Sequence, residues 1–153
     1  QDGELVAFDT DMVGPYGYCA DISRAFVVGN KFNEEQKKLY SMAVEQIDYN
    51  SRLIKDGLSF KEFTDKSWVL PEDYYPNRYS VMVHGIGLCD EWPAIRYPTD
   101  GGERGGTFQK NMTITIESYI GKVGGKEGVK LEQQYLIGEN GLELMSHHPL
   151  EDI

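Results

Sequence analysis

The chain contains, at residues 5–28, the sequence LVAFDTDMVGPYGYCADISRAFVV, which predicts a β-hairpin. A short apolar strand over residues 5–8 runs into the polar sequence Asp9-Thr10-Asp11. The sequence Gly14-Pro15-Tyr16-Gly17 is typical of a turn, because proline presets one backbone dihedral and glycine accepts positive φ values. Residues 18–28 are then expected to form the return strand.

Three carboxylates fall on one side of this hairpin. Asp9 and Asp11 are two residues apart, so in a strand their side chains point to the same face. A turn centred on residues 15–16 brings Asp21 beside that pair. Carboxylates this close repel one another, so without partners they would stay protonated or destabilise the hairpin. Taken alone, the three are more simply interpreted as a solvated acidic hairpin.

The rest of the chain predicts one long helix and more strands. Asn33 followed by Gln36 is typical of a helix N-cap with a capping-box partner, and apolar residues then recur at helical spacing. We expect a helix over residues 34–56, with Gly57 as its C-cap, and a shorter helix over 60–67. Strands are expected at residues 79–83, 112–117, 129–136 and 142–145. Antiparallel strands with one long helix indicate an α+β fold.

Three further polar residues lie in or beside these strands. His84 follows an apolar strand, Glu117 lies on the polar face of an alternating strand, and Glu132 interrupts a run rich in valine and leucine. Each alone is more often a salt-bridged glutamate or a hydrogen-bonded core histidine. Together with the hairpin they give five carboxylates and one imidazole, which suit two divalent cations and would cancel most of the charge. The candidate metal ligands are Asp9, Asp11, Asp21, His84, Glu117 and Glu132.

Composition sets the class of protein. The 153 residues, 17.3 kDa, are 40% hydrophobic and 26% charged, which fits one globular domain with a core. No apolar run approaches the roughly 20 residues of a membrane span. A net charge of -10 argues against nucleic acid or anionic membrane as partners. Two cysteines indicate a reducing compartment, and we expect a cytoplasmic protein. Because Gln1 is not a start methionine, we expect the chain to be part of a longer protein.

Several motifs resemble those of the pita-bread metallopeptidases, which include methionine aminopeptidase, aminopeptidase P, prolidase and their non-peptidase relative creatinase. Residues 21–26, DISRAF, resemble their D-I-T-R-T-F, and residues 84–88, HGIGL, match their H-G-I-G-L. Residues 112–117 resemble the strand of their fourth ligand, and Lys130-Leu131-Glu132 is similar to their R-x-E.

This resemblance implies a curved antiparallel sheet with flanking helices around a two-metal centre of iron, manganese, zinc or cobalt. It also implies a homodimer. Residues 1–153 would then be the metal-binding C-terminal half of the catalytic domain. The first half of that domain and an N-terminal domain would be absent from this chain, which alone is expected to be inactive.

Two departures from the peptidase pattern stand out. The peptidases place their first two metal aspartates eleven residues apart, but here that position is Thr10, flanked by Asp9 and Asp11. They also continue H-G-I-G-L-x-x-H-E-x-P, whereas Leu88 is followed by CDEWP at residues 89–93, so Asp90 stands where their second histidine would be. An ionised carboxylate cannot donate a hydrogen bond to an oxyanion, but it can abstract a proton.

Both departures resemble the dimethylsulfoniopropionate (DMSP) lyase branch of this fold. That resemblance implies β-elimination of a small-molecule substrate to acrylate and dimethyl sulfide, with Asp90 as base and Tyr79 as a second catalytic residue. Trp92, Tyr79 and Tyr16 are candidates to face the sulfonium through cation–π contact, although ordinary packing is the simpler interpretation of each. The alternatives are a metal-dependent Xaa-Pro peptidase and a non-catalytic binding domain.

Overall fold

The computed structural model describes residues 1–29, 31–102 and 105–150. The helices are α1 (Glu34–Leu53) and α2 (Phe60–Lys66), and short 3-10 turns lie at Pro15–Gly17, Tyr75–Asn77 and Pro98–Asp100. The strands are β1 (Leu5–Val13), β2 (Cys19–Val27), β3 (Val81–Gly85), β4 (Ala94–Arg96), β5 (Thr113–Gly121), β6 (Gly128–Ile137) and β7 (Leu142–Leu144).

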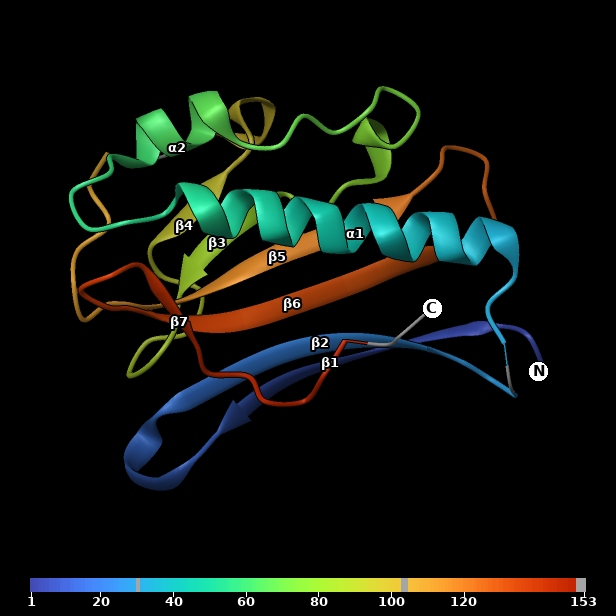
Figure 1. The fold of residues 1–153 in the computed structure, drawn as a ribbon, viewed down its shortest axis with the longest axis horizontal. Helices are drawn as coiled ribbons and strands as arrows, with labels where there is room; N and C mark the ends of the chain where they lie inside the picture. The colour runs from blue at the N-terminus through green and yellow to red at the C-terminus, as the bar shows by residue number, and fades with distance from the viewer. Residues whose placement is uncertain (30, 103–104, 151–153) are drawn as a thin grey trace.

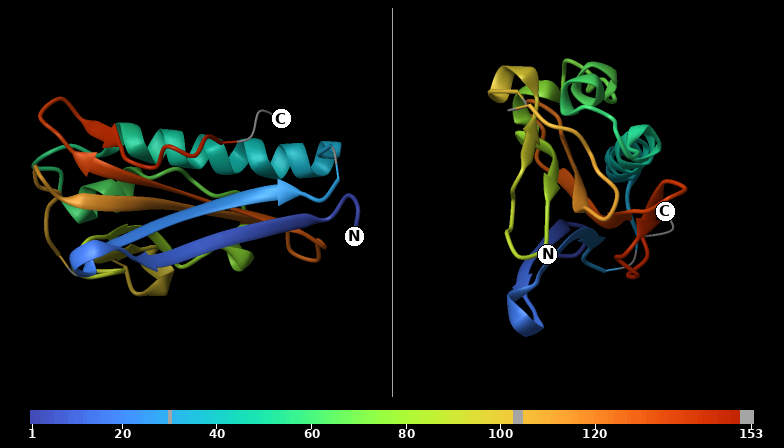
Figure 2. Two further views of the ribbon diagram at one scale, coloured as in Figure 1. Left: turned by 90° about the horizontal axis from the view of Figure 1, so that it is seen from below. Right: turned by 90° about the vertical axis from the view of Figure 1, so that its left-hand side faces the viewer.

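The strands form a hairpin and a larger antiparallel sheet. Strands β1 and β2 pair with each other, and the five-stranded sheet has the order β4-β3-β5-β6-β7. Helix α1 lies across β5 and β6, while β2 runs beside β6 (Figure 1). The turned views place the helices and the hairpin on different sides of the sheet (Figure 2). The predicted α+β class is confirmed, and the short strand β4 was not predicted.

Helix α1 begins where the sequence predicts and ends earlier. The Asn33 side chain accepts from the Gln36 backbone N–H at 2.9 Å, and the Gln36 side chain accepts from the Asn33 N–H at 2.9 Å. The predicted end at residue 56 is wrong, because the C-cap is Ile54 and Gly57 has φ +83°. The Gly57 N–H donates to the Phe108 carbonyl, so the chain has left the helix by that point. Within the described ranges, no helix combines the length and apolar character needed to cross a bilayer.

Strand β5 buries both of its faces. Ser118 donates to the Gln46 side chain of α1 at 2.7 Å, so by strand alternation Ile114 and Ile116 also face the helix. The opposite face carries Thr115 and Glu117, as the sequence predicts. These polar residues are nevertheless buried, because the hairpin side of the sheet is covered as well.

The hairpin has the predicted register and is tied to β6. Asp11 pairs directly with Asp21, and Asp9 pairs with Ser23. Arg24 is buried and donates from Nη1 to the Glu132 carbonyl oxygen at 2.7 Å. Its Nη2 donates to Gln133 Oε1 at 2.6 Å. These bonds fix β2 along β6, so the carboxylates of the hairpin face those of the sheet.

Replacing Asn33 with alanine tests the contribution of the capping box to α1. The Asn33→Ala variant loses the acceptor for the Gln36 N–H, so unfolding should become easier by about 1 kcal/mol, a fall in melting temperature of roughly 2–4 °C. Thermal unfolding followed by circular dichroism measures the change. Lys38→Ala, at an exposed position of the same helix, is the matched control and should leave the melting temperature nearly unchanged. Equal melting temperatures for both variants would contradict the assignment.

Candidate metal centre

Four buried polar side chains meet between the hairpin and the five-stranded sheet. They come from four strands, β2, β3, β5 and β6, and are Asp21, His84, Glu117 and Glu132, none more than 4% exposed. His84 Nε2 lies 3.3 Å from Glu117 Oε1 and 3.4 Å from Glu132 Oε1. Asp21 Oδ2 lies 3.8 Å from the same nitrogen. His84 Nδ1 lies 3.0 Å from the Gly85 carbonyl oxygen, and an N–H donated there leaves Nε2 facing the carboxylates.

Burial and mutual repulsion dominate the electrostatics of this cluster. Burial, followed by the charge of Glu132, raises the pKa of Asp21 to about 9. Burial also raises the pKa of Glu117. Burial alone would lower the pKa of His84, but the carboxylates of Glu117 and Glu132 outweigh it and raise that pKa to about 11. Without a metal ion the cluster therefore retains protons at neutral pH.

The donor atoms fit a divalent cation. Asp21 Oδ1, His84 Nε2 and Glu132 Oε1 are buried and lack a hydrogen-bond partner of good geometry among the described residues. Asp21, His84 and Glu132 each offer a ligand atom within 4.8 Å of the others. Buried polar atoms without partners are costly, and carboxylates with an imidazole are the ligands that divalent transition metals take.

A second group of potential metal ligands lies next to the first. One carboxylate oxygen from each of Asp11, Asp21 and Asp90 lies within 4.8 Å of the others. Asp21 belongs to both groups. Asp11 is exposed and Asp90 half-buried, which makes this second group the more open of the two.

Asp9 reaches the cluster through two neighbours that the sequence did not single out. Ser23 Oγ donates to Asp9 Oδ1, and Lys130 Nζ lies 3.2 Å from Asp9 Oδ2. Lys130 Nζ also lies 2.5 Å from Glu117 Oε2 and 3.8 Å from Glu132 Oε2. Sequence reasoning treated Lys130 only as part of a motif. Its spacing of two from Glu132 in a strand was the available signal that both side chains share a face.

The loop between β3 and β4 folds back and places Asp90 beside the cluster. The Gly85 N–H donates to the Pro93 carbonyl oxygen at 2.9 Å, which draws the two ends of the loop together. A Cβ on Gly85 would lie 2.2 Å from the Trp92 carbonyl oxygen, so this approach requires glycine. Asp90 Oδ1 accepts the Glu91 N–H at 2.9 Å, and Glu91 has φ 56°, a strained backbone next to the candidate base.

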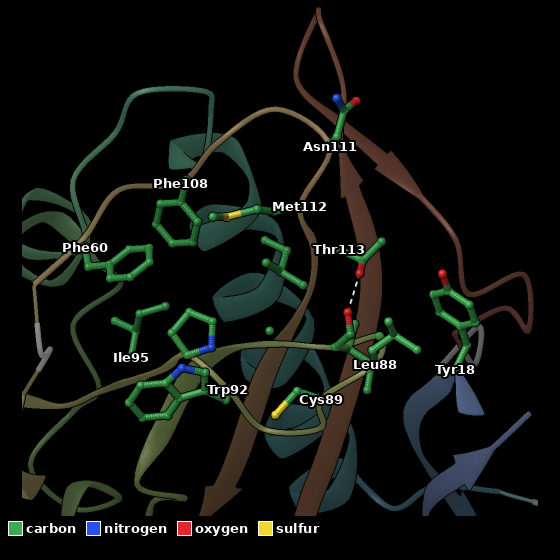
Figure 3. A pocket seen from close by; sticks show the side chains of 15 residues that line it. Tyr18, Phe60, Leu88, Cys89, Trp92, Ile95, Phe108, Asn111, Met112 and Thr113 are labelled. Carbon is green, nitrogen blue, oxygen red and sulfur yellow. Dashed lines mark hydrogen bonds between the residues drawn. The ribbon is translucent and has the colours of Figure 1, made fainter. Parts of the chain in front are cut away.

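The aromatic candidates lie in three different places. Tyr79 donates to Glu91 Oε1 at 3.3 Å, and burial with the charges of Glu117 and Glu91 raises its pKa to about 12. Trp92 is 53% exposed and helps to line an apolar cavity of about 360 Å³ together with Phe108 (Figure 3). Tyr16 is 96% exposed in the turn of the hairpin.

Comparison with known proteins identifies relatives of two kinds. The model of metallopeptidase family M24 matches residues 1–139. The dimethylsulfoniopropionate lyase DddP of Roseovarius nubinhibens is 37% identical over 155 residues, covering 99% of this chain and 34% of the lyase. The Xaa-Pro dipeptidase of Pyrococcus furiosus is 32% identical over 149 residues, covering 94% of this chain and 40% of the dipeptidase.

A solved structure of a prolidase has a similar fold. The prolidase from Pyrococcus horikoshii OT3 matches with a TM-score of 0.80 at 29% identity, covering 100% of this chain and 43% of the prolidase chain. The chain thus spans 34–40% of the length of these two curated relatives and less than half of the solved prolidase. Its fold corresponds to half of a pita-bread fold, as the sequence predicts.

The protons held by the cluster predict a pH dependence for the metal-free protein. Between about pH 6.5 and 9, the folded chain retains protons on Asp21 and His84 that the unfolded chain releases above pKa values of 3.8 and 6.5. The unfolded state then binds fewer protons, so stability falls as pH rises. After treatment with a chelator, the melting temperature at pH 8.5 should lie below that at pH 6.5. The melting temperature of Asp21→Asn should change less with pH than that of the wild type. A wild-type melting temperature that rises with pH would contradict the prediction.

Proposed function

The chain belongs to metallopeptidase family M24, and from that premise we propose that residues 1–153 are the metal-binding half of the catalytic domain of a DMSP lyase. The proposed reaction is a β-elimination that gives acrylate and dimethyl sulfide. The identity of 37% to the Roseovarius lyase supports this choice of substrate. The centre described above is compatible with this reaction, because its carboxylates and imidazole suit divalent cations, but it does not by itself distinguish a lyase from a peptidase.

One observation carries the proposal more than any other, namely the position of the Asp90 carboxylate. It lies beside Asp11 and Asp21, where the peptidase pattern would supply an imidazole. A carboxylate at this point can accept a proton from a substrate bound at the centre. It cannot stabilise an oxyanion by donating a hydrogen bond, which amide hydrolysis would require.

The residues that would hold two divalent cations (iron, manganese, zinc or cobalt) are Asp9, Asp11, Asp21, His84, Glu117 and Glu132. Such cations, when bound, would draw charge from the substrate carboxylate and so acidify the neighbouring C–H bond. The chain contributes the fixed geometry of these donors. Arg24 holds β2 against β6, and the Gly85 hydrogen bond closes the loop that carries Asp90.

The chemical step is the removal of one proton and the departure of one sulfide. Asp90 takes the proton from the carbon next to the carboxylate, and the released electron pair forms the double bond of acrylate. The bond between the next carbon and sulfur breaks, so dimethyl sulfide leaves as a neutral molecule. Asp90 is only half-buried, so water can carry its proton away afterwards.

Two aromatic residues are proposed to receive the rest of the substrate. Tyr79 stays neutral because its pKa is raised to about 12, so it can donate a hydrogen bond but does not serve as the base. Its ring and that of Trp92 offer faces to the sulfonium cation. Both lie on segments that flank the loop carrying Asp90, since Tyr79 bonds to Glu91 and Trp92 follows it.

The second candidate is an Xaa-Pro peptidase. It is favoured by the match to the Pyrococcus dipeptidase and by the retention of histidine and two glutamates as donors. In this function Asp90 would be a tolerated variant of the peptidase histidine. Homodimer formation and a cytoplasmic location also stay predictions, which sedimentation analysis and cell fractionation can test.

The lyase proposal is tested by following dimethyl sulfide in the headspace above metal-loaded full-length protein and DMSP. The wild type should release dimethyl sulfide, and Asp90→Asn should lower the rate at least about 100-fold because the base is lost. Metal content by mass spectrometry is the control, because a lower rate at unchanged metal content assigns the loss to the base. Cleavage of an Xaa-Pro dipeptide without release of dimethyl sulfide would overturn the lyase proposal in favour of the peptidase. No activity in either assay would overturn both.

A further inference from the structure

Lys130 lies within the acidic cluster as a cation supplied by the chain itself. Its Nζ is 2.5 Å from Glu117 Oε2, 3.2 Å from Asp9 Oδ2 and 3.8 Å from Glu132 Oε2. It donates to Ser23 Oγ at 3.0 Å. The residue is only 9% exposed, and carboxylate oxygens of three acidic residues surround its ammonium. Lys130 is therefore charged in the interior.

The two glutamates divide their oxygens between two cationic positions. In Glu117, Oε1 faces His84 and Oε2 faces Lys130. In Glu132, Oε1 likewise faces His84 and Oε2 faces Lys130. Carboxylates that bridge two cations are the usual arrangement of a two-metal site. Here the ammonium lies against the Oε2 oxygens of both glutamates.

We propose that Lys130 competes with one of the two metal ions and thereby sets the affinity of the centre for the second metal. This inference rests on the proposed metal centre but not on the identity of its substrate. The ammonium and a divalent cation would need the same oxygens of Asp9 and the glutamates. They also repel each other at this range, so the second metal binds fully only when the ammonium withdraws.

An aromatic ring also adjoins the ammonium in this position. Lys130 Nζ lies over the ring of Tyr79, 4.9 Å from its centroid. A cation over an aromatic face is stabilised, more so where water is excluded.

Calorimetric titration of the chelator-treated full-length protein with Mn²⁺ alone tests the competition. The wild type should bind two ions with unequal affinities. Lys130→Met keeps the length of the side chain and removes its charge, so the second dissociation constant should fall at least about tenfold. Lys130→Arg retains the charge and should behave as the wild type does. Lys122→Met, which removes a surface ion pair with Asp73, is the matched control and should change neither constant.

Thermal unfolding gives a second readout should the methionine variant fold poorly without metal. Its melting temperature without metal should lie below that of the wild type, and Mn²⁺ should raise it by more. An unchanged or weaker second affinity, with two ions still bound, would overturn the role of Lys130 and leave the metal centre intact. If neither protein binds Mn²⁺, the metal centre and this inference both fail. The loss of lyase activity alone would bear only on the proposed function.

Discussion

The direct opposition of two buried glutamates across β5 and β6 is the constraint on which this structure depends. Glu117 pairs with Glu132 in the register of the strands, and both side chains are almost fully buried. Like charges in directly opposite positions destabilise a sheet, and burial adds the cost of lost hydration. Positively charged groups on both sides of the pair offset this cost. His84 supplies one from β3, and Lys130 supplies the other from β6 itself.

The hairpin lies over the face of the sheet that carries these glutamates. It covers the polar face of the sheet and excludes water, but it brings Asp9, Asp11 and Asp21 with it. The formal charge of the centre would be zero with these three aspartates, the two glutamates, the Lys130 ammonium and two divalent cations. Without the lysine the same set would keep one net negative charge. The ammonium therefore offsets part of the carboxylate charge, most of all before the second metal is bound.

Features that follow from local periodicity could be predicted from the sequence. The alternation of apolar and polar residues in β5 predicted the correct face for Glu117. The turn at residues 14–17 predicted that Asp21 lies beside Asp11, with which it pairs. Features that depend on tertiary contacts could not. Helix α1 ends at Leu53, and the segment after it is held by a hydrogen bond from Gly57 to Phe108, which is far away in sequence. The inclusion of Lys130 in the cluster depends on how the hairpin packs against β6, which no local pattern reveals.

The register of the hairpin also accounts for the pair of aspartates that flanks Thr10. Because Asp11 lies opposite Asp21, only the odd-numbered residues of β1 face the centre. Thr10 faces away and donates to the Ile22 carbonyl oxygen of the partner strand. A ligand eleven residues before Asp21 would therefore point out of the centre, and inward positions exist only at its two neighbours. These neighbours lie about 7 Å apart along the strand, so they serve different parts of the cluster. Asp9 meets Lys130 while Asp11 meets Asp21 and Asp90, and the doubled aspartate thus follows from the way this hairpin pairs.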